Sequence, residues 1–375
     1  MPVPRQPALS RRGFLQQAGA GLVTSGLLTG VAEAQRVPEP PGRKLGWAIV
    51  GLGSLAINQI LPAFARCEQS RVTALVSGHP DKARKLAARY AVLEKNIYNY
   101  ENYDSLSGNP DVDVVYVVLP NGMHAEYTIR AAKAGKHVLC EKPMANTPAD
   151  CQQMIEACRA AGRKLMVAYR LHYEPHNQAL IKVVRNQEFG PLKVVLADAG
   201  FPIGDPTQWR LKKDMAGGGS LMDIGIYALN AARYLTGEEP TAVNAMEYTT
   251  PGDPRFREVE ETITFQLRFP SGVLANCTSS YGAPFNRFRV TGTTGWAELE
   301  PALSYSGLRM RAGAGGRLET RDQPVIDQFA AEMDHFSGCV MQGTDPKTPG
   351  EEGLKDLTIM MAIYRAAQEG TALKL

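Results

Sequence analysis

The chain has 375 residues, of which 44% are hydrophobic and 21% are charged, as in soluble globular proteins. This length is too great for one ordinary core and predicts two domains. The formal net charge of +3 comes largely from the first 34 residues, where three arginines oppose one glutamate. The remainder carries 38 basic against 37 acidic residues. Such a balance gives no reason to expect binding to nucleic acid or to an anionic membrane.

The N-terminus has the pattern of an export signal. Ser10-Arg11-Arg12-Gly13-Phe14-Leu15 resembles the twin-arginine motif, and a mildly apolar run from Ala18 to Ala32 follows it. Ala32-Glu33-Ala34 places small residues at the positions that a signal peptidase reads. Glycine and threonine residues in the apolar run disfavour a membrane anchor. The pattern predicts a cleaved leader over residues 1–34 and a folded protein exported to the periplasm.

A proline-rich stretch and the cysteines complete the general picture. Residues 35–44 are predicted to be an extended arm with no core of its own. Cys140 falls in an expected strand, and Cys151 and Cys158 lie seven residues apart on an expected helix. The six cysteines form no CxxC pair, which predicts buried free thiols and no metal site.

Short apolar segments alternate with helical ones between residues 45 and 168. The expected strands are 47–50, 72–76, 112–119, 137–140 and 164–168, and the expected helices are 58–67, 81–91, 125–134 and 147–161. The run 112–119 is continuously apolar, as in a parallel strand buried on both faces. The alternation predicts a doubly wound parallel α/β sheet, that is, a Rossmann domain.

Residues 169–375 have a different pattern. The expected helices are 176–185, one beginning near Gly219, 328–341 and 353–369, and the expected strands are 242–248, 261–269, 273–281, 288–293 and 296–299. Their spacing predicts an α+β domain with an open, mostly antiparallel sheet. We expect this domain to bind substrate and to form a homo-oligomer, a dimer or a tetramer, with the last helices packing on the first domain.

A glycine-rich turn follows the first strand. Gly51-Leu52-Gly53-Ser54-Leu55-Ala56 fits GxGxx(G/A) between a strand and a helix. Gly51 permits the tight turn, Gly53 lets a pyrophosphate approach the backbone, and Ser54 and Leu55 complete the turn. The pattern predicts a dinucleotide site.

The segment after the second strand indicates which dinucleotide binds. NAD enzymes usually carry an acid there, whereas this chain has Ser77-Gly78-His79-Pro80-Asp81-Lys82. A hydroxyl at Ser77 and a cation at Lys82 suit a 2′-phosphate, so the segment predicts NADP. The alternative for Lys82 is a solvated helix charge, and Asp81 is interpreted as a helix cap.

Two further strand ends carry polar groups. Leu119-Pro120-Asn121 ends the long apolar run, with His124 three residues later, and we expect all four at the ligand-facing edge of the sheet. A capping or edge histidine is the alternative for His124. Glu141-Lys142-Pro143 follows the next strand, and a lysine in that place suggests proton chemistry. Glu141 either pairs with Lys142 or anchors the turn.

These segments together resemble the Gfo/Idh/MocA oxidoreductase family. The resemblance spans Lys44 to Leu375 and is carried by the glycine turn, Leu119-Pro120-Asn121, Glu141-Lys142-Pro143, Tyr169-Arg170-Leu171-His172-Tyr173 and the run GGGSLMDIGIY at 217–227. The leader, the segment around Ser77 and a tyrosine at 227, where many relatives have histidine, are similar to the glucose–fructose and aldose–aldose oxidoreductase type.

The resemblance implies a catalytic pair of Lys142 and Tyr227. A free tyrosine has a pKa of about 10, and a nearby lysine cation favours the phenolate that can accept a sugar's anomeric proton. Asp223 lies four residues before Tyr227 and would share its face of a helix. It either orients a sugar hydroxyl, balances Lys142, or bonds to backbone near the glycine run.

Several other residues are expected near the cofactor and the substrate. Trp209-Arg210 offers an aromatic ring beside a guanidinium, which suits sugar stacking or nicotinamide contact. Arg170 and Tyr173 are expected in the same pocket, with a core role as the alternative for Tyr173. The resemblance adds Tyr100 beside the cofactor.

The function implied by the resemblance is an NADP-dependent sugar oxidoreductase with a tightly bound cofactor. One aldose is oxidised to a lactone, and the NADPH formed reduces a second sugar to an alditol in ping-pong order. A dehydrogenase that exchanges free NADP and a nucleotide-binding protein without chemistry are the alternatives. The loop 199–208 is shorter than in the glucose–fructose enzyme, which leaves the acceptor sugar open.

Overall fold

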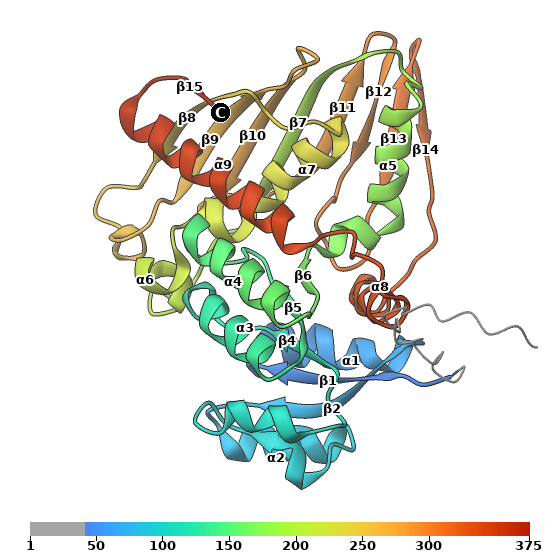
Figure 1. Ribbon diagram of the computed structural model, residues 1–375. Helices are drawn as coiled ribbons and strands as arrows, with labels where there is room; N and C mark the ends of the chain where they lie inside the picture. Colours follow the sequence, from blue (N-terminus) through green and yellow to red (C-terminus); the bar gives the residue numbers. More distant parts are fainter. Residues whose placement is uncertain (1–41) are drawn as a thin grey trace, which may run out of the picture. The chain divides into compact units, whose positions relative to one another are not determined.

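Two β-sheets organise residues 42–375, which are the residues that the computed structural model describes (Figure 1). The predicted leader and the proline-rich arm up to residue 41 lie outside the described residues.

The first sheet has six parallel strands in the order β3-β2-β1-β4-β5-β6. They are β1 (Leu45–Val50), β2 (Ser70–Val76), β3 (Ile97–Tyr98), β4 (Val114–Val117), β5 (His137–Glu141) and β6 (Leu165–Ala168). Helices α3 (His124–Lys133) and α4 (Pro148–Ala160) pack on one face, and α1 (Leu61–Ala63), α2 (Pro80–Arg89) and α8 (Gln328–Gln342) pack on the other. Alternate residues of β1 show this division, because Ala48 and Val50 belong to the first cluster and Trp47 and Ile49 to the second. The doubly wound prediction is confirmed.

The second sheet has nine strands in the order β14-β13-β12-β11-β7-β10-β9-β8-β15. They are β7 (Leu192–Gly200), β8 (Ala242–Tyr248), β9 (Thr262–Arg268), β10 (Leu274–Ser280), β11 (Phe285–Gly292), β12 (Gly295–Leu299), β13 (Met310–Ala314), β14 (Arg317–Thr320) and β15 (Leu373–Lys374). Every neighbouring pair is antiparallel except β7 with β10. The predicted open, mostly antiparallel sheet is therefore confirmed.

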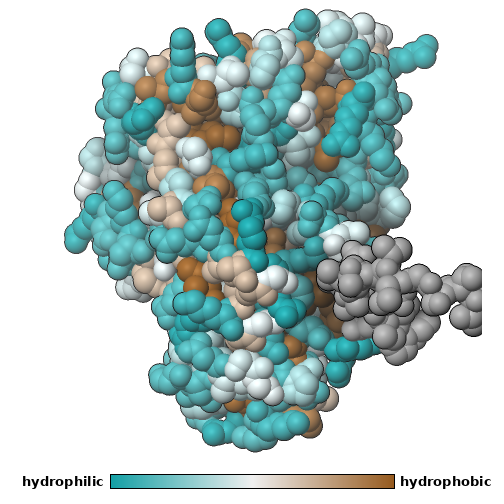
Figure 2. Space-filling view, viewed as in Figure 1, coloured by the Kyte–Doolittle hydropathy of each residue, from teal (hydrophilic) through white to brown (hydrophobic). Residues whose placement is uncertain are grey.

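One face of this sheet is covered by α5 (Pro175–Arg185), α7 (Ile226–Thr236) and α9 (Gly350–Glu369). Side chains on the other face are exposed at alternate positions of β9. That face also exposes Met246, Tyr248 and Leu274. In the view of Figure 2, hydrophilic side chains cover most of the surface and hydrophobic ones lie in small groups between them.

Helix α8 returns from the second half of the chain to the first sheet. Trp47 of β1 donates a hydrogen bond from Nε1 to Ser337 Oγ at 3.1 Å, and its ring lies 6.1 Å from that of Phe336. Ser70 of β2 is 2.8 Å from the same Ser337 hydroxyl. Of the two helices expected to pack on the first domain, α8 makes these contacts with the first sheet.

Several local predictions need correction. The helix expected over 58–67 begins at Ala56 and passes through a π-helical turn (Ala56–Ile60), α1 and a 3₁₀ turn (Phe64–Arg66), because Pro62 lacks the N–H that a continuous helix requires. Asp81 is not a helix cap, since His79 occupies that position and Asp81 pairs with Arg84 in the first turn.

Strands β3, β7, β13, β14 and β15 were not predicted. β7 mixes charged and apolar residues, and β14 is exposed along its length, so neither shows a clear period of two. The remaining helical turns are short: α6 (Lys213–Ala216), the π-helical Leu221–Gly225, and the 3₁₀ turns Glu94–Asn96, Tyr103–Gly108, Asn121–Met123, Arg170–Tyr173, Trp209–Leu211 and Pro254–Phe256.

All six cysteines are buried free thiols, as predicted. Within residues 42–375, no helix combines the length and the apolar character that crossing a membrane requires. The same residues contain no group of three or more potential metal ligands.

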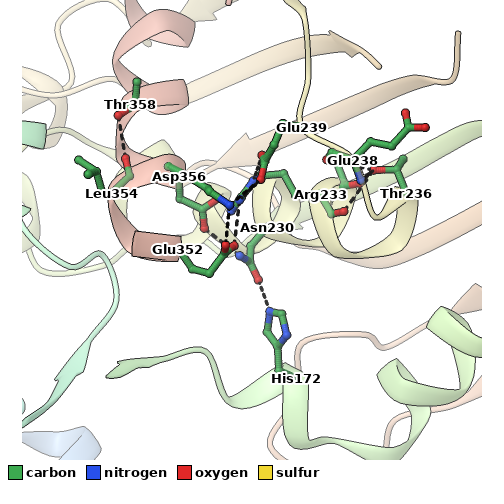
Figure 3. A network of polar contacts seen from close by, with 12 residues as sticks. His172, Asn230, Arg233, Thr236, Glu238, Glu239, Glu352, Leu354, Asp356 and Thr358 are labelled. Atoms are coloured by element: carbon green, nitrogen blue, oxygen red, sulfur yellow. Dashed lines mark hydrogen bonds and ion pairs between the residues drawn. The ribbon is translucent and has the colours of Figure 1, made fainter. Parts of the chain in front are cut away.

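A buried polar network joins α7 to α9 (Figure 3). Arg233 of α7 pairs with Asp356 of α9 at 2.6 Å and also with Glu239 and Glu352. Asn230 donates to Asp356 at 2.8 Å, and its carbonyl oxygen lies 2.8 Å from His172 Nε2 in the turn Arg170–Tyr173. The network therefore fixes α7 relative to α9 and to that turn.

Replacing Asp356 by alanine should destabilise the protein strongly. Asp356 is fully buried, so its loss leaves the Arg233 cation short of its innermost partner, and we expect about 3 kcal/mol less free energy of unfolding. Glu239→Gln is the control, because Glu239 is half exposed and its pair should contribute about 1 kcal/mol or less. Urea denaturation measures both, and equal losses would contradict the prediction.

Candidate active site

Lys142 lies directly after β5 and meets residues from the second half of the chain. Its Nζ is 2.5 Å from the main-chain oxygen of Asp223 and 3.3 Å from Asp223 Oδ1. The same ammonium lies 4.8 Å from the centre of the Tyr227 ring. The structure thus brings together the three residues predicted to be catalytic. Lys142 and Asp223 keep 11% and 15% of their side chains exposed, so a ligand can reach them.

Asp223 is the anion of this group. Its Oδ2 accepts hydrogen bonds from Arg210 Nε at 2.9 Å and from the Tyr281 hydroxyl at 3.1 Å. Burial alone would raise the pKa of Asp223, but Arg210 and Lys142 outweigh it and lower the pKa to about 2. The carboxylate is therefore ionised at neutral pH.

Lys142 is a stable cation. Burial disfavours its charge, yet Tyr227, Asp223 and Glu141 more than offset burial and raise the pKa of Lys142. An ammonium with a raised pKa donates hydrogen bonds and stabilises negative charge, and it does not act as a base near neutrality.

The Tyr227 hydroxyl accepts a hydrogen bond from Arg170 Nε at 3.2 Å. Arg170 is buried, and its other nitrogens donate to Gln328 Oε1 and to the main-chain oxygen of Leu303, both at 2.6 Å. Each of the three guanidinium nitrogens thus donates one hydrogen bond within the protein. Arg170 was predicted near the cofactor, and the structure places its guanidinium against Tyr227, where it supports that side chain.

Glu141 anchors the turn that carries Lys142. Its Oε1 accepts from the Tyr116 hydroxyl at 2.7 Å, and its Oε2 accepts from the main-chain N–H of Lys142 at 3.2 Å. Of the two alternatives for Glu141, the geometry favours the anchor.

Asp223 and Tyr227 lie on a helical segment of mixed type. Asp223 is in the π-helical turn Leu221–Gly225, and Tyr227 is in the first turn of α7. The spacing between these two residues is therefore wider than in an α-helix. π-Helical turns of this kind occur frequently at functional sites. One alternative for Asp223 was that its carboxylate bonds to the backbone near the glycine run. Glu260 has that role instead, because it accepts a hydrogen bond from Gly219 N at 2.7 Å.

The glycine turn after β1 has the geometry of a phosphate cradle. Gly51 has φ of +92°, and a Cβ there would lie 2.4 Å from the main-chain oxygen of Val118, so only glycine fits. A Cβ on Gly53 would meet nothing within 4 Å, and Ser54 beside it is exposed, while Leu55 is half-buried. The open space above Gly53 is where a pyrophosphate can approach the backbone.

The segment after β2 lies beside that turn. Lys82 Nζ is 3.4 Å from the main-chain oxygen of Leu52, so its cation reaches the glycine turn. Ser77 Oγ accepts from His79 N at 3.1 Å, which leaves its own proton free to be donated. Gly78 lies against the Tyr100 ring, at 3.0 Å from where its Cβ would be. These groups fit a dinucleotide that carries a further phosphate.

The polar side chains of the Leu119–His124 loop bond mainly to main-chain oxygens of the protein. The fully buried His124 ring lies 2.8 Å from the Leu119 oxygen and 2.9 Å from the Pro143 oxygen, behind the site. The predicted cofactor contact of His124 is thus replaced by a structural one, and burial lowers its pKa. Asn121 Nδ2 donates to the Ala216 oxygen at 2.9 Å, while Pro120 is half-buried.

The remaining predicted pocket residues separate into two groups. Trp209 and Arg210 are half-buried, with the guanidinium 4.6 Å from the indole centre and bonded to Asp223. Tyr169 and Tyr173 are buried in the core, and Tyr173 Oη lies near Met166 of β6. The core alternative for Tyr173 is therefore the one that the packing favours.

Three residues of this region were not predicted from the sequence. Tyr281 ends the predicted strand 273–281, so the reasoning that identified Lys142 at a strand end could have found it. Tyr305, whose ring lies 4.7 Å from the Arg170 guanidinium, has no sequence signal. Glu332 interrupts the apolar face of α8 between Phe329 and Phe336, and an acid in such a place is the signal that was overlooked.

Comparison with known proteins agrees with this geometry. Residues 45–169 match the family model of the oxidoreductase family with an NAD-binding Rossmann fold, and residues 177–298 match the GFO/IDH/MocA C-terminal domain. D-xylose 1-dehydrogenase [NADP(+)] of Haloarcula marismortui is 33% identical over 88% of this chain and 92% of its own length.

Solved structures give the same result. Aldose–aldose oxidoreductase from Caulobacter crescentus, crystallised with glycerol, is 56% identical with a TM-score of 0.87, covering 89% of this chain and all of that one (100%). A 3-ketoreductase from Actinomadura kijaniata in complex with NADP and TDP-benzene is 26% identical with a TM-score of 0.78, covering 86% of this chain and 98% of its own.

Glu332→Gln should stabilise the protein at neutral pH. Glu332 is fully buried, and neither carboxyl oxygen has a hydrogen-bond partner among residues 42–375. Burial, with Glu141 nearby, raises its pKa well above the ordinary value of 4.5, although Arg170 offsets part of the shift. The pKa of Glu332 is higher in the folded than in the unfolded protein. Below pH 4.5 the carboxyl is protonated in both states and causes no loss of stability. As the pH rises from 4.5 toward the folded-state pKa, the free energy of unfolding falls by about 1.4 kcal/mol per pH unit. Glutamine carries no such penalty.

Thermal unfolding between about pH 5 and pH 8 measures this difference. The control is Glu298→Gln, because Glu298 is equally buried but pairs with Arg289 and Arg311, and its replacement should lower stability. A loss of stability in the Glu332 variant at neutral pH would contradict the expectation.

Proposed function

This chain belongs to the GFO/IDH/MocA oxidoreductase family, and we propose that it is a periplasmic, NADP-dependent sugar oxidoreductase that retains its cofactor. An aldose is oxidised to its lactone and leaves, and a second sugar then enters and is reduced to an alditol. The first sugar loses a hydride from carbon and a proton from oxygen, and the second sugar gains a hydride at carbon and a proton at oxygen.

The observation that carries this proposal is the contact of Lys142 with both Asp223 and Tyr227. The glycine turn after β1, with Ser77 and Lys82, would hold the nucleotide, and a bound nicotinamide would supply the hydride acceptor for the first sugar and the hydride donor for the second. The phenolate form of Tyr227 accepts the proton of the anomeric hydroxyl at Oη and becomes the phenol, and the hydrogen bond from Arg170 stabilises the phenolate. Lys142 stabilises the charge that develops on the sugar oxygen, and Asp223 holds Lys142 in place. In the second half of the cycle the proton returns by the same route.

NADP is favoured over NAD by the residues beside the glycine turn. Ser77 and Lys82 supply a hydroxyl and a cation, and a carboxylate there would repel a 2′-phosphate. The D-xylose 1-dehydrogenase of Haloarcula marismortui is named as an NADP(+) enzyme, which supports the same choice.

Retention of the cofactor is supported by the similarity to an aldose–aldose oxidoreductase, since such a name describes two sugars and no free nucleotide. A second candidate function, a dehydrogenase that exchanges free NADP, is favoured by the similarity to D-xylose 1-dehydrogenase. Both share the site described above and differ in how firmly the nucleotide is held.

The proposed location and assembly have separate support. The segment from Ser10 to Leu15 resembles the twin-arginine motif, and export of the folded protein would carry the cofactor along. The outer face of the second sheet exposes Met246, Tyr248 and Leu274, which suits an interface between copies of the chain.

The choice between the two candidate functions can be tested on protein purified from its own compartment. We expect NADP(H) to accompany the protein in near-equimolar amount and to cycle when an aldose and a second sugar are added together. Product analysis by chromatography should find lactone and alditol in equal amounts. Protein free of nucleotide that turns over one sugar only with added NADP would favour the exchanging dehydrogenase.

Tyr227→Phe should abolish the reaction while the cofactor remains bound. The phenyl ring keeps its contact with Lys142 but has no oxygen to take the proton, and we expect a loss of at least about 100-fold in the rate of sugar-dependent NADP reduction. Stopped-flow absorbance measures the rate, and nucleotide content after gel filtration measures binding. Tyr90→Phe, at the end of α2, is the control. An unchanged rate in the Tyr227 variant would refute the assignment.

A further inference from the structure

The glycine run before the catalytic segment is packed against two polar side chains. A Cβ on Gly219 would lie 2.0 Å from the main-chain oxygen of Glu260, and one on Gly218 would lie 2.2 Å from the Tyr364 hydroxyl. Gly217 has φ of +78° at the end of α6, a conformation that favours glycine. The run is therefore glycine-rich because Glu260 and Tyr364 occupy the space that side chains would need.

Glu260 holds the start of the segment that carries Asp223 and Tyr227. Its Oε2 accepts from Gly219 N at 2.7 Å, and its Oε1 accepts from Leu221 N at 2.9 Å. The Tyr364 hydroxyl of α9 donates to the same Oε1 at 2.9 Å. Glu260 is only 8% exposed, so these three donors take the place of water around its carboxylate.

The held segment begins with the π-helical turn Leu221–Gly225. The first N–H groups of a helical segment have no partner within the segment and need an acceptor from elsewhere. The Glu260 carboxylate meets this need for Leu221 N and also accepts from Gly219 N just before the segment, and Ser220 N reaches the main-chain oxygen of Glu260 at 3.4 Å. A shift of this turn would move Asp223 and Tyr227 together relative to Lys142.

We propose that Glu260 is the positioning residue of the active site, which sets where Asp223 and Tyr227 stand relative to Lys142. This role rests on the proposed function, since it concerns the same reaction. Glu260 touches none of the reacting groups and acts only through the main chain of Gly219 and Leu221.

The neighbouring Glu261 offers a matched control within the same chain. It is 9% exposed, so its burial equals that of Glu260. Its Oε2 accepts from Thr250 N at 2.8 Å, in the loop before the 3₁₀ turn Pro254–Phe256, which carries none of the proposed catalytic residues. Replacing either acid by glutamine removes one buried charge, but of the two side chains only that of Glu260 hydrogen-bonds to the segment that carries Asp223 and Tyr227.

The experiment compares Glu260→Gln, Glu261→Gln and Tyr227→Phe in the full-length protein with its cofactor. A glutamine at 260 presents one carbonyl oxygen where two carboxylate oxygens stood, and its amide turns an N–H toward another N–H. We expect sugar-dependent NADP reduction to slow by about 10- to 100-fold, the effect of misplacing a reacting group, with little change in cofactor content or in KM for the sugar. Glu261→Gln should stay within about threefold of wild type while losing as much thermal stability.

A crystal structure of the Glu260→Gln variant supplies a readout that is independent of activity. We expect Tyr227 Oη to move away from Arg170 Nε, which lies 3.2 Å away in the wild-type arrangement. Should that variant fail to fold, Tyr364→Phe decides, because it removes one of the three donors and leaves both main-chain bonds. A loss of a few-fold in rate is then expected, with the cofactor retained.

The outcomes separate the two proposals. Equal rates for Glu260→Gln and Glu261→Gln, with Tyr227→Phe inactive, would overturn the role of Glu260 and leave the proposed function intact. Activity in Tyr227→Phe would overturn the proposed function, and the position of Tyr227 in the crystal structure would still test Glu260. An unchanged rate in Tyr364→Phe, where that variant is the one that decides, overturns the role of Glu260.

Discussion

A lysine ammonium withdrawn from water is stable only beside negative charge, and the counter-ion of Lys142 lies in the other half of the chain. Glu141, the nearest acid in sequence, is occupied by the Tyr116 hydroxyl and by main-chain N–H. Asp223 therefore provides the charge, and it remains ionised because Arg210 and Tyr281 occupy its second oxygen. The active site exists only when the two sheets are correctly packed, since neither half contains both members of the pair.

Strand and helix periodicity predicted the fold class because the first sheet buries continuous apolar runs and α4 begins with a side-chain cap. Thr147 accepts from Asp150 N at 3.1 Å, as Thr147-Pro148 indicated. The position of Lys142 followed from a general rule, that groups at the carboxyl ends of parallel strands face the ligand. The same rule was misleading for His124, whose ring turns inward to two main-chain oxygens. Which way a side chain turns at a strand end depends on loops that no local pattern describes.

Three further residues that were not predicted from the sequence have partners far away in the chain. Glu260 and Tyr364 meet the glycine run from a loop and from α9, and Gln328 reaches Arg170 from α8. None of these has a periodic or motif signal, because each is defined by a partner that lies 39 or more positions away in the chain. The glycine run itself was read as part of a family motif. Its physical reason, exclusion of Cβ atoms by Glu260 and Tyr364, required the tertiary structure.

The position of α8 has a consequence for the order of events during synthesis. Trp47 belongs to the first strand, yet the residues that cover it, Phe336 and Ser337, are made nearly 300 positions later. Until the ribosome has released that helix, the part of this face that α1 and α2 do not cover remains apolar and exposed, a state that chaperones recognise in nascent chains. The nucleotide-binding half therefore cannot mature ahead of the rest. Its completion, and with it a finished cradle for the nucleotide, follows the synthesis of α8.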